Sequence, residues 1–196
     1  MRGYGICSRL PRADHQFWAS RRGFLRHLAA AAAGTFLSPS ASALSILFPK
    51  ERELSFFNLH TEEKLVIPYC PARRCPPSVL SKVNYLLRDH RAEKVHPIDP
   101  ALLDILHAIS VLSGSRGTFQ VISGYRAPET NTMLHQTTSG VASQSLHTEG
   151  KAIDVQLSDV NTQDMRQIAA GLRLGGVGYY PESDFVHLDT GAVRTW

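Results

Sequence analysis

The stretch Ser145-Leu-His-Thr-Glu-Gly-Lys-Ala-Ile-Asp154 decides the interpretation of this 196-residue chain. Its imidazole, His147, lies just before a glycine turn, and the residues after the turn alternate as they do in a strand. Side chains two apart in a strand share one face of the sheet. Ile153 therefore faces a core, whereas Ala152 and Asp154 face the other side, where a small alanine leaves room beside the carboxylate.

The partner of Asp154 is the open question, because an unpaired carboxylate is costly to bury. One interpretation is a metal site, in which a histidine nitrogen and an aspartate oxygen lie roughly 2.0–2.2 Å from zinc. The other is a purely structural hydrogen bond between His147 and Asp154, since many buried polar pairs have no further role. The stretch by itself leaves both interpretations open.

Periodic segments on both sides of this stretch predict a mixture of helices and strands. Apolar residues recur at helical spacing over 78–90, and Asp99 followed by Pro100 begins a helix that ends at Ser113-Gly114. The order predicts a single α+β domain with a central, mainly antiparallel sheet flanked by helices. The other predicted elements are a hairpin of 54–59 and 64–69, strands over 118–123, 151–157 and 185–189, helices over 129–136 and 162–172, a loop over 140–144, and a glycine-rich connection over 175–178.

The N-terminus has the pattern of a cleavable export signal. Ser20-Arg21-Arg22-Gly23-Phe24-Leu25-Arg26 precedes an apolar, alanine-rich run, and Ala41-Ser42-Ala43 resembles a cleavage site. The paired arginines resemble a twin-arginine signal. We therefore expect residues 1–43 to be a signal peptide, 44–196 to be the mature domain, and the location to be the bacterial periplasm. A membrane anchor is the alternative, but the apolar run is shorter than the roughly 20 residues that span a bilayer.

The charge of the chain excludes one class of partner. The formal net charge is +4, but many of the arginines lie in the predicted signal, and no run of lysine and arginine occurs elsewhere. A nucleic-acid partner is therefore not expected. We also expect no stable membrane insertion after signal cleavage, and a monomer.

Cys70 and Cys75 bracket a short loop. In an oxidising compartment a local disulfide is the favoured interpretation. A pair of thiolate metal ligands is less favoured, because no second Cys or His pair lies at the required spacing. Two free thiols are the remaining alternative.

Ser145-x-His147-x-x-Gly150-x-Ala152-x-Asp154 resembles the signature of the zinc D-alanyl-D-alanine peptidase family, whose fold also occurs in hedgehog signalling domains. Further segments resemble the murein endopeptidase K branch of that family. They are His60-Thr61, Leu87-Arg88-Asp89-His90-Arg91, Ser123-Gly124-Tyr125-Arg126, Gly175-Gly176-Val177-Gly178-Tyr179-Tyr180 and Phe185-Val186-His187-Leu188-Asp189-Thr190-Gly191.

The resemblance implies one zinc ion per chain, bound by His147, Asp154 and His187. Strand alternation supports the third ligand, because His187 then faces the cleft while its two neighbours face the core. Three protein ligands leave an open position, as catalytic zinc sites require. The resemblance also implies that Arg126 holds substrate or developing negative charge. The alternative for Arg126 is an ordinary surface ion pair.

Other polar residues near these positions complete the expected site. Ser123 and Gln144 can donate hydrogen bonds to substrate, and Tyr179, with Tyr180, can line a groove. The family places an acidic residue three positions before the last histidine, which favours Asp184 as general base. Asp189 shares the face of His187 and is the competing base or a partner that orients an imidazole. A third candidate, Glu149, is expected to be a solvated turn residue.

Three functions fit these residues. The first, which the branch resemblance favours, is a zinc endopeptidase that hydrolyses the peptide cross-links of peptidoglycan stem peptides during wall growth or remodelling. The second is a carboxypeptidase or dipeptidase that trims terminal D-alanine. The third is a wall-binding domain that keeps zinc for structure only. The bond cleaved and the regulation are not encoded in composition or spacing.

Overall fold

The computed structural model describes residues 53–138 and 140–196. The predicted signal peptide, its paired arginines and the start of the mature domain lie outside these residues. None of the helices in the described ranges is long and apolar enough to cross a membrane.

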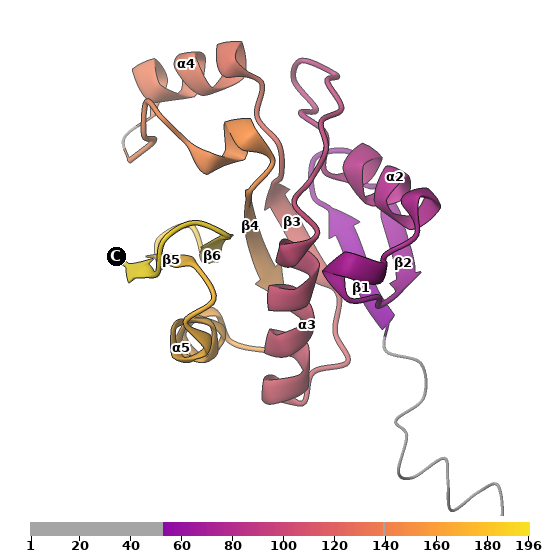
Figure 1. The fold of residues 1–196 in the computed structure, drawn as a ribbon. Coiled ribbons are helices and arrows are strands. Elements are labelled where there is room, and N and C mark those ends of the chain that lie inside the picture. The colour runs from indigo at the N-terminus through magenta and orange to yellow at the C-terminus, as the bar shows by residue number, and fades with distance from the viewer. Residues whose placement is uncertain (1–52, 139) are drawn as a thin grey trace, which may run out of the picture. The chain divides into compact units, whose positions relative to one another are not determined.

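A seven-stranded sheet forms the centre of the domain (Figure 1). Its order is β2-β1-β3-β4-β6-β5-β7, and the β1–β3 and β5–β7 pairs are parallel while the other four are antiparallel. The prediction of a mainly antiparallel α+β fold is therefore confirmed. The strands are β1 (Glu53–Asn58), β2 (Lys64–Pro68), β3 (Phe119–Ser123), β4 (Ala152–Leu157), β5 (Gly176–Tyr180), β6 (Phe185–Asp189) and β7 (Arg194–Thr195).

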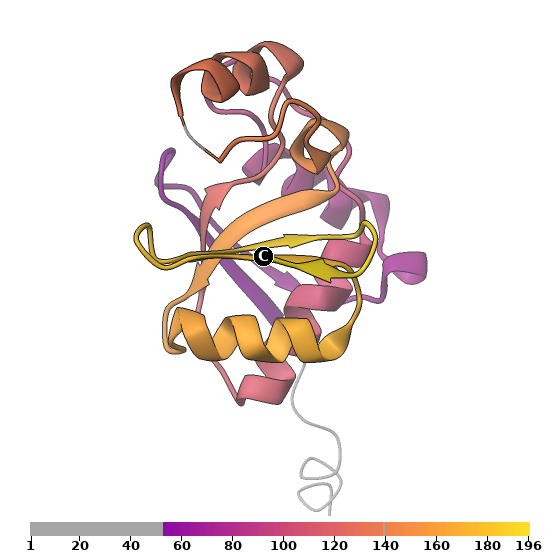
Figure 2. The same cartoon turned by 90° about the vertical axis from the view of Figure 1, so that its left-hand side faces the viewer.

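Within the described residues, four α-helices and two short 3-10 helices accompany the sheet. Helices α3 and α5 pack against each other, and α5 also contacts β5 and β6. In the two views of the chain, α4 lies at the opposite end of the sheet from α5 (Figures 1 and 2). The helices are η1 (Ala72–Arg74), α2 (Pro77–Leu86), α3 (Ala101–Ser113), α4 (Pro128–Thr137), η2 (Leu146–Glu149) and α5 (Thr162–Leu172).

Helix α3 shows how the sequence signals produced the expected elements. The Asp99 carboxylate accepts a hydrogen bond of 3.0 Å from the Ala101 amide, which satisfies one of the free N–H groups of the first turn. Leu106 and Ile109 are fully buried in the core. The helix ends at Gly114, which adopts a left-handed conformation with φ of 67°.

The core lies on the face of the sheet that α3 and α5 cover. Ile153 and Val155 of β4 are fully buried among the apolar side chains of these helices. Because neighbouring side chains point to opposite faces, Asp154 is left on the other face, as the alternation predicts. That face carries the polar site described below.

Two strands were not predicted, and one helix is shorter than predicted. The glycine-rich connection over 175–178 indicates a turn by composition, yet most of it belongs to β5. The two-residue strand β7 carries no local signal at all. Helix α2 ends at Leu86 rather than at His90, because the chain turns there to place Asp89 in a buried hydrogen-bonding position. Cys70 and Cys75 are joined by a disulfide, as favoured.

Candidate metal centre

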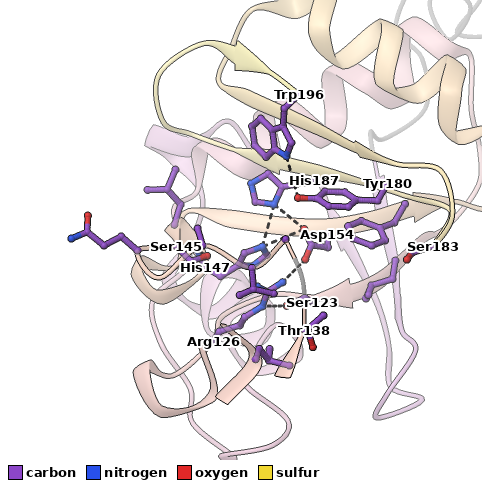
Figure 3. Close-up of a pocket in the computed structure, with 18 of the residues that line it drawn as sticks. Ser123, Arg126, Thr138, Ser145, His147, Asp154, Tyr180, Ser183, His187 and Trp196 are labelled. Carbon is purple, nitrogen blue, oxygen red and sulfur yellow. Dashed lines mark hydrogen bonds and ion pairs between the residues drawn. The ribbon is translucent and has the colours of Figure 1, made fainter. Parts of the chain in front are cut away.

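His147, Asp154 and His187 meet at one point on the polar face of the sheet (Figure 3). The β4–β6 register places Asp154 directly opposite His187, and η2, just before β4, supplies His147. Asp154 Oδ1 lies 3.2 Å from His147 Nε2 and 2.8 Å from His187 Nδ1. The two imidazole nitrogens are 3.2 Å apart. The sequence-predicted ligands are therefore brought together, although they are up to 40 residues apart.

His147 is fixed by the short helix and the glycine turn that follow Ser145. The Ser145 hydroxyl caps the helix by accepting from the His147 amide at 3.3 Å. Gly150 ends the helix in a left-handed conformation, and a Cβ there would lie 2.2 Å from the Pro97 carbonyl oxygen. The Nδ1 atom of His147 lies 2.7 Å from the Gly124 carbonyl oxygen and must donate to it. Nε2 is thereby left unprotonated and faces the cluster.

His187 is oriented in the same manner by Asp189. The Asp189 carboxylate is fully buried and lies 3.1 Å from His187 Nε2. It also accepts hydrogen bonds from the amides of Gly176 and Gly191, and it forms an ion pair with Arg194 at 2.7 Å. A carboxylate held this firmly fixes the proton of His187 on Nε2 and directs Nδ1 inward, as in many metal-bound histidines.

Arg126 holds the other oxygen of Asp154. Its guanidinium forms a 2.5 Å ion pair with Asp154 Oδ2, and its Nε donates to the Ser123 hydroxyl at 2.8 Å. Arg126 follows the end of β3, and its own amide bonds to the His147 carbonyl, so the segments that carry both residues are joined. The arginine is thus in the cleft rather than in a surface ion pair.

Burial and pairing set the protonation states of the cluster. Burial lowers the pKa of the His147 imidazole despite the nearby Asp154 carboxylate. Burial also opposes the charged form of His187, but its hydrogen bonds to Asp154 and Asp189 outweigh this and raise its pKa. For Asp154 burial alone would raise the pKa, yet the two imidazoles hold the pKa well below its usual range. Asp154 is therefore ionised, and its negative charge favours a cation within the cluster.

The donor set fits a zinc ion. The outer partners of the two imidazoles leave three lone pairs directed at one another, which repel unless a cation or a shared proton lies between them. A tetrahedral zinc with bonds of about 2.0–2.1 Å places its ligand atoms about 3.3 Å apart. The separations of 2.8–3.2 Å are close to this value. Two histidines and one aspartate are also a ligand set that zinc prefers.

Known proteins share this sequence over most of its length. The family described as peptidoglycan L,D-endopeptidase MepK matches residues 47–196. Peptidoglycan L,D-endopeptidase MepK of Escherichia coli K12 is 40% identical over 181 residues, which cover 92% of this chain and 99% of that protein. The probable peptidoglycan L,D-endopeptidase MepK of Haemophilus influenzae is 41% identical over 166 residues, which cover 84% and 89%.

The chain belongs to the MepK family. This confirms the resemblance to the zinc D-alanyl-D-alanine peptidases, because MepK is a branch of the M15 peptidases, which depend on zinc. All described residues fall inside the matched region. The match therefore concerns the whole sheet and the cluster, and not a shared motif alone.

In this member of the MepK family the cluster lies in a cavity of about 570 Å³. Among the residues proposed from the sequence, Ser123, Arg126 and Gln144 line it. The lining also includes residues that sequence reasoning missed as site residues: Arg91, Arg194 and Trp196. Arg91 stands in one of the motif segments quoted above, which was the available signal. Arg194 and Trp196 lie beyond the last motif, so no sequence signal marked them as site residues.

Tyr179 lies on the wrong side of the sheet for the groove. It packs against the core, and the Arg166 guanidinium lies 5.7 Å from its ring. Its neighbour Tyr180 lines the cavity instead and stacks on Phe185, with ring centroids 4.5 Å apart. Because β5 was not predicted as a strand, the faces of its two tyrosines could not be assigned.

Asp184 lies on the turn between β5 and β6 and is not among the residues that line the cavity. Its carboxylate accepts from the Thr162 hydroxyl at 2.6 Å and from the Gln156 amide at 3.3 Å. Gln156 is two residues beyond Asp154 on β4 and Thr162 is the first residue of α5, so Asp184 lies at the end of the sheet, beyond the cluster. Glu149 is exposed and paired with Lys151, as expected for a turn residue.

Proposed function

We propose that this chain is a zinc-dependent peptidoglycan L,D-endopeptidase that hydrolyses peptide cross-links between stem peptides during wall growth or remodelling. The observation that supports this most is the inward-facing set of His147 Nε2, Asp154 Oδ1 and His187 Nδ1 in an open cavity. The names of the relatives supply the bond type, which is a peptide bond from an L-residue to a D-residue.

The three residues of the cluster would hold one zinc ion through these atoms. A bound zinc ion supplies Lewis acidity, which polarises a carbonyl oxygen and makes water a stronger acid. The chain's own contribution is the fixed geometry. Gly124 and Asp189 hold the imidazole tautomers, and Arg126 occupies the second oxygen of Asp154, which keeps that carboxylate from rotating.

Arg126 is proposed to bind the oxygen of the scissile carbonyl. A guanidinium carries five N–H donors. In Arg126 one is used on Ser123 and one on Asp154, and the other three have no partner among the described residues. Donors held in place before the reaction stabilise an oxyanion without reorganising. Ser123 therefore acts by positioning Arg126, and Gln144, exposed on the cavity lining, is proposed to donate a hydrogen bond to the substrate backbone.

Asp184 is proposed as the proton acceptor and Asp189 as the residue that orients His187. Both oxygens of Asp189 are occupied by charged and amide donors, which outweigh burial and hold its pKa well below the usual range, so it is a weak base. Asp184 is exposed and accepts hydrogen bonds from neutral side chains only. A carboxylate can act through one intervening water molecule.

The charge of the cavity suits a stem peptide, which carries free carboxylates. Arg91, Arg126 and Arg194 line the cavity, and Asp154 is the only acidic side chain among its described lining residues. Arg126 and Arg194 are paired with buried aspartates. Arg91 is exposed and has no ion pair among the described residues, so its charge is available to a substrate carboxylate.

We also propose that the chain reaches the periplasm by the twin-arginine route, because its substrate lies there and its first residues carry Arg21-Arg22 before an apolar run. We propose that it works as a monomer, since one chain supplies all three metal ligands and Arg126.

Digestion of purified sacculi tests the proposed activity. Zinc-loaded protein comprising residues 44–196 is incubated with sacculi, with and without a chelator, and the products are separated and identified by mass spectrometry. Cross-linked dimers should be converted to monomers only while zinc is bound. Unchanged cross-linking by protein that contains one zinc per chain would refute the endopeptidase proposal.

The products also separate the alternatives. A carboxypeptidase or dipeptidase would remove D-alanine from uncross-linked stem peptides and leave the dimers intact. A wall-binding domain would sediment with sacculi and release nothing.

A further inference from the structure

Trp196 is fixed at the edge of the cavity by its backbone. Its amide donates to the Val177 carbonyl at 3.2 Å, and its carbonyl accepts from the Tyr179 amide at 3.1 Å. These bonds extend the parallel pairing of β7 with β5. The backbone of Trp196 is therefore hydrogen-bonded to β5, directly after β7.

The indole is held as firmly as the backbone. Its Nε1 donates to the Tyr180 hydroxyl at 3.1 Å, and its ring centroid lies 5.3 Å from that of His187 (Figure 3). The Arg194 guanidinium lies 4.9 Å from the indole, while its charge is paired with Asp189. Trp196 therefore contacts His187, a proposed zinc ligand, directly. Through Arg194 it is also connected to Asp189, which orients His187.

Gly178 provides the space for this ring. It pairs with His187 across β5 and β6, and a Cβ there would lie 2.6 Å from two ring carbons of Trp196. Gly178 has no positive φ, so the glycine is required by the close approach of the ring and not by the backbone conformation. The position of the Trp196 ring therefore depends on the glycine at 178.

Part of Trp196 remains accessible. Trp196 is 47% exposed although its polar atom is bonded and its ring is packed, and it lines the cavity together with Tyr180 and Phe185. These three residues form what we call the aromatic wall. Arg126 and Ser123 lie on the other side of His147 and Asp154 (Figure 3). A chain bound over the cluster would pass between the aromatic wall and Arg126.

We infer that Trp196 is a substrate-contacting residue, and that its indole binds the aliphatic part of the amino acid next to the scissile bond. This inference rests on the proposed function. Stem peptides combine short aliphatic chains with carboxylates, and the cavity offers an aromatic wall on one side of the cluster and the unpaired N–H donors of Arg126 on the other. A rigid aromatic side chain gives such contact area at low cost in conformational entropy.

Fluorescence gives a direct test of contact. The sequence has two tryptophans, and Trp18 lies in the predicted signal, so Trp196 is the only one in residues 44–196. The zinc-loaded Asp184→Asn variant, which is expected to keep its metal and to hydrolyse slowly, is titrated with a purified cross-linked muropeptide dimer. We expect a saturable change in tryptophan emission. No change at dimer concentrations that saturate the loaded enzyme would overturn the inference, while failure of the proposed function would appear separately as absence of hydrolysis.

Variants test the same contact by kinetics. Trp196→Ala should raise KM for the dimer about tenfold and change kcat less than threefold, and Trp196→Phe should restore most of the loss. Val193→Ala, an exposed apolar residue of the same segment outside the cavity lining, is the control with unchanged KM. Zinc content and a thermal melt show that each variant is folded and loaded. An unchanged KM in folded Trp196→Ala would refute the inference.

Gly178→Ala provides a second route to the same defect, because the added methyl group displaces the indole. Its KM should rise like that of Trp196→Ala, and the double variant should be no worse than Trp196→Ala alone. Additive losses in the double variant would mean that Gly178 acts through the backbone and not through Trp196, which would contradict the coupling.

Discussion

At the scale of single residues, the two aspartates near His187 have separable roles. Asp189 is buried and paired with four donor residues, whereas Asp184 is exposed on a turn. Asp189→Asn should weaken zinc binding by about 10–100-fold, because the proton of His187 is no longer held by a charged acceptor. Competition with a chromophoric chelator measures this affinity, and an unchanged affinity would rule out the orienting role.

Asp184→Asn should leave zinc affinity unchanged and lower kcat by about 10²–10⁴-fold, as expected when a general base is removed. The substitution is well suited to the site, because Asp184 has a φ of 50° and asparagine tolerates this left-handed conformation. A variant that retains full kcat would show that another group accepts the proton.

Arg91 allows a test of charge in the cavity. Arg91→Gln should raise KM for a cross-linked muropeptide about 2–5-fold, the size expected for an exposed ion pair. Salt screens such pairs, so the difference from the unmodified enzyme should diminish as ionic strength rises. Arg116→Gln, which removes an exposed arginine outside the cavity lining, is the control. Equal KM values for both variants would exclude Arg91 from substrate binding.

At the scale of elements, Asp89 joins the segment after α2 to the segment that carries Arg126. Its buried carboxylate accepts from the Ala127 amide at 2.8 Å and from the amides of Arg91 and Ala92. Burial alone would raise its pKa, but hydrogen bonds from Thr130 and these amides outweigh burial and lower it. Asp89→Asn should cost about 1–3 kcal/mol of unfolding free energy at pH 7.

The pH dependence of this contribution has a defined sign. A carboxylate with a lowered folded pKa stabilises the protein above the unfolded value of roughly 3.9, and the contribution is lost as pH falls through the folded pKa. Urea unfolding with a chelator present should therefore show the two proteins converging as the pH is lowered from about 5 through the unfolded pKa of roughly 3.9 and below. A difference that stays constant over this range would mean that the charge of Asp89 is not involved.

At the scale of the whole molecule, the proposed twin-arginine signal can be tested by its effect on export. Replacing Arg21-Arg22 by two lysines should prevent export, because the twin-arginine route recognises the paired arginines. Cell fractionation with an antibody against the mature domain measures the distribution. Periplasmic accumulation of the lysine variant would refute the proposed route and leave the proposed activity unaffected.

Local patterns in the sequence determined most of the elements, and the resemblance to the peptidase family supplied the identity of the cluster. Alternation assigned Asp154 and His187 to the face opposite the core, and the caps at Asp99 and Gly114 gave both ends of α3, because these signals depend on neighbours a few residues apart. Only the tertiary structure decided that Tyr180 rather than Tyr179 lines the cavity, and that Trp196 lies over Gly178 beside His187. Both placements follow from the pairing of β5 with β6 and β7. Strand pairing brings together residues that are far apart in the sequence, and no local pattern indicates which strands will pair.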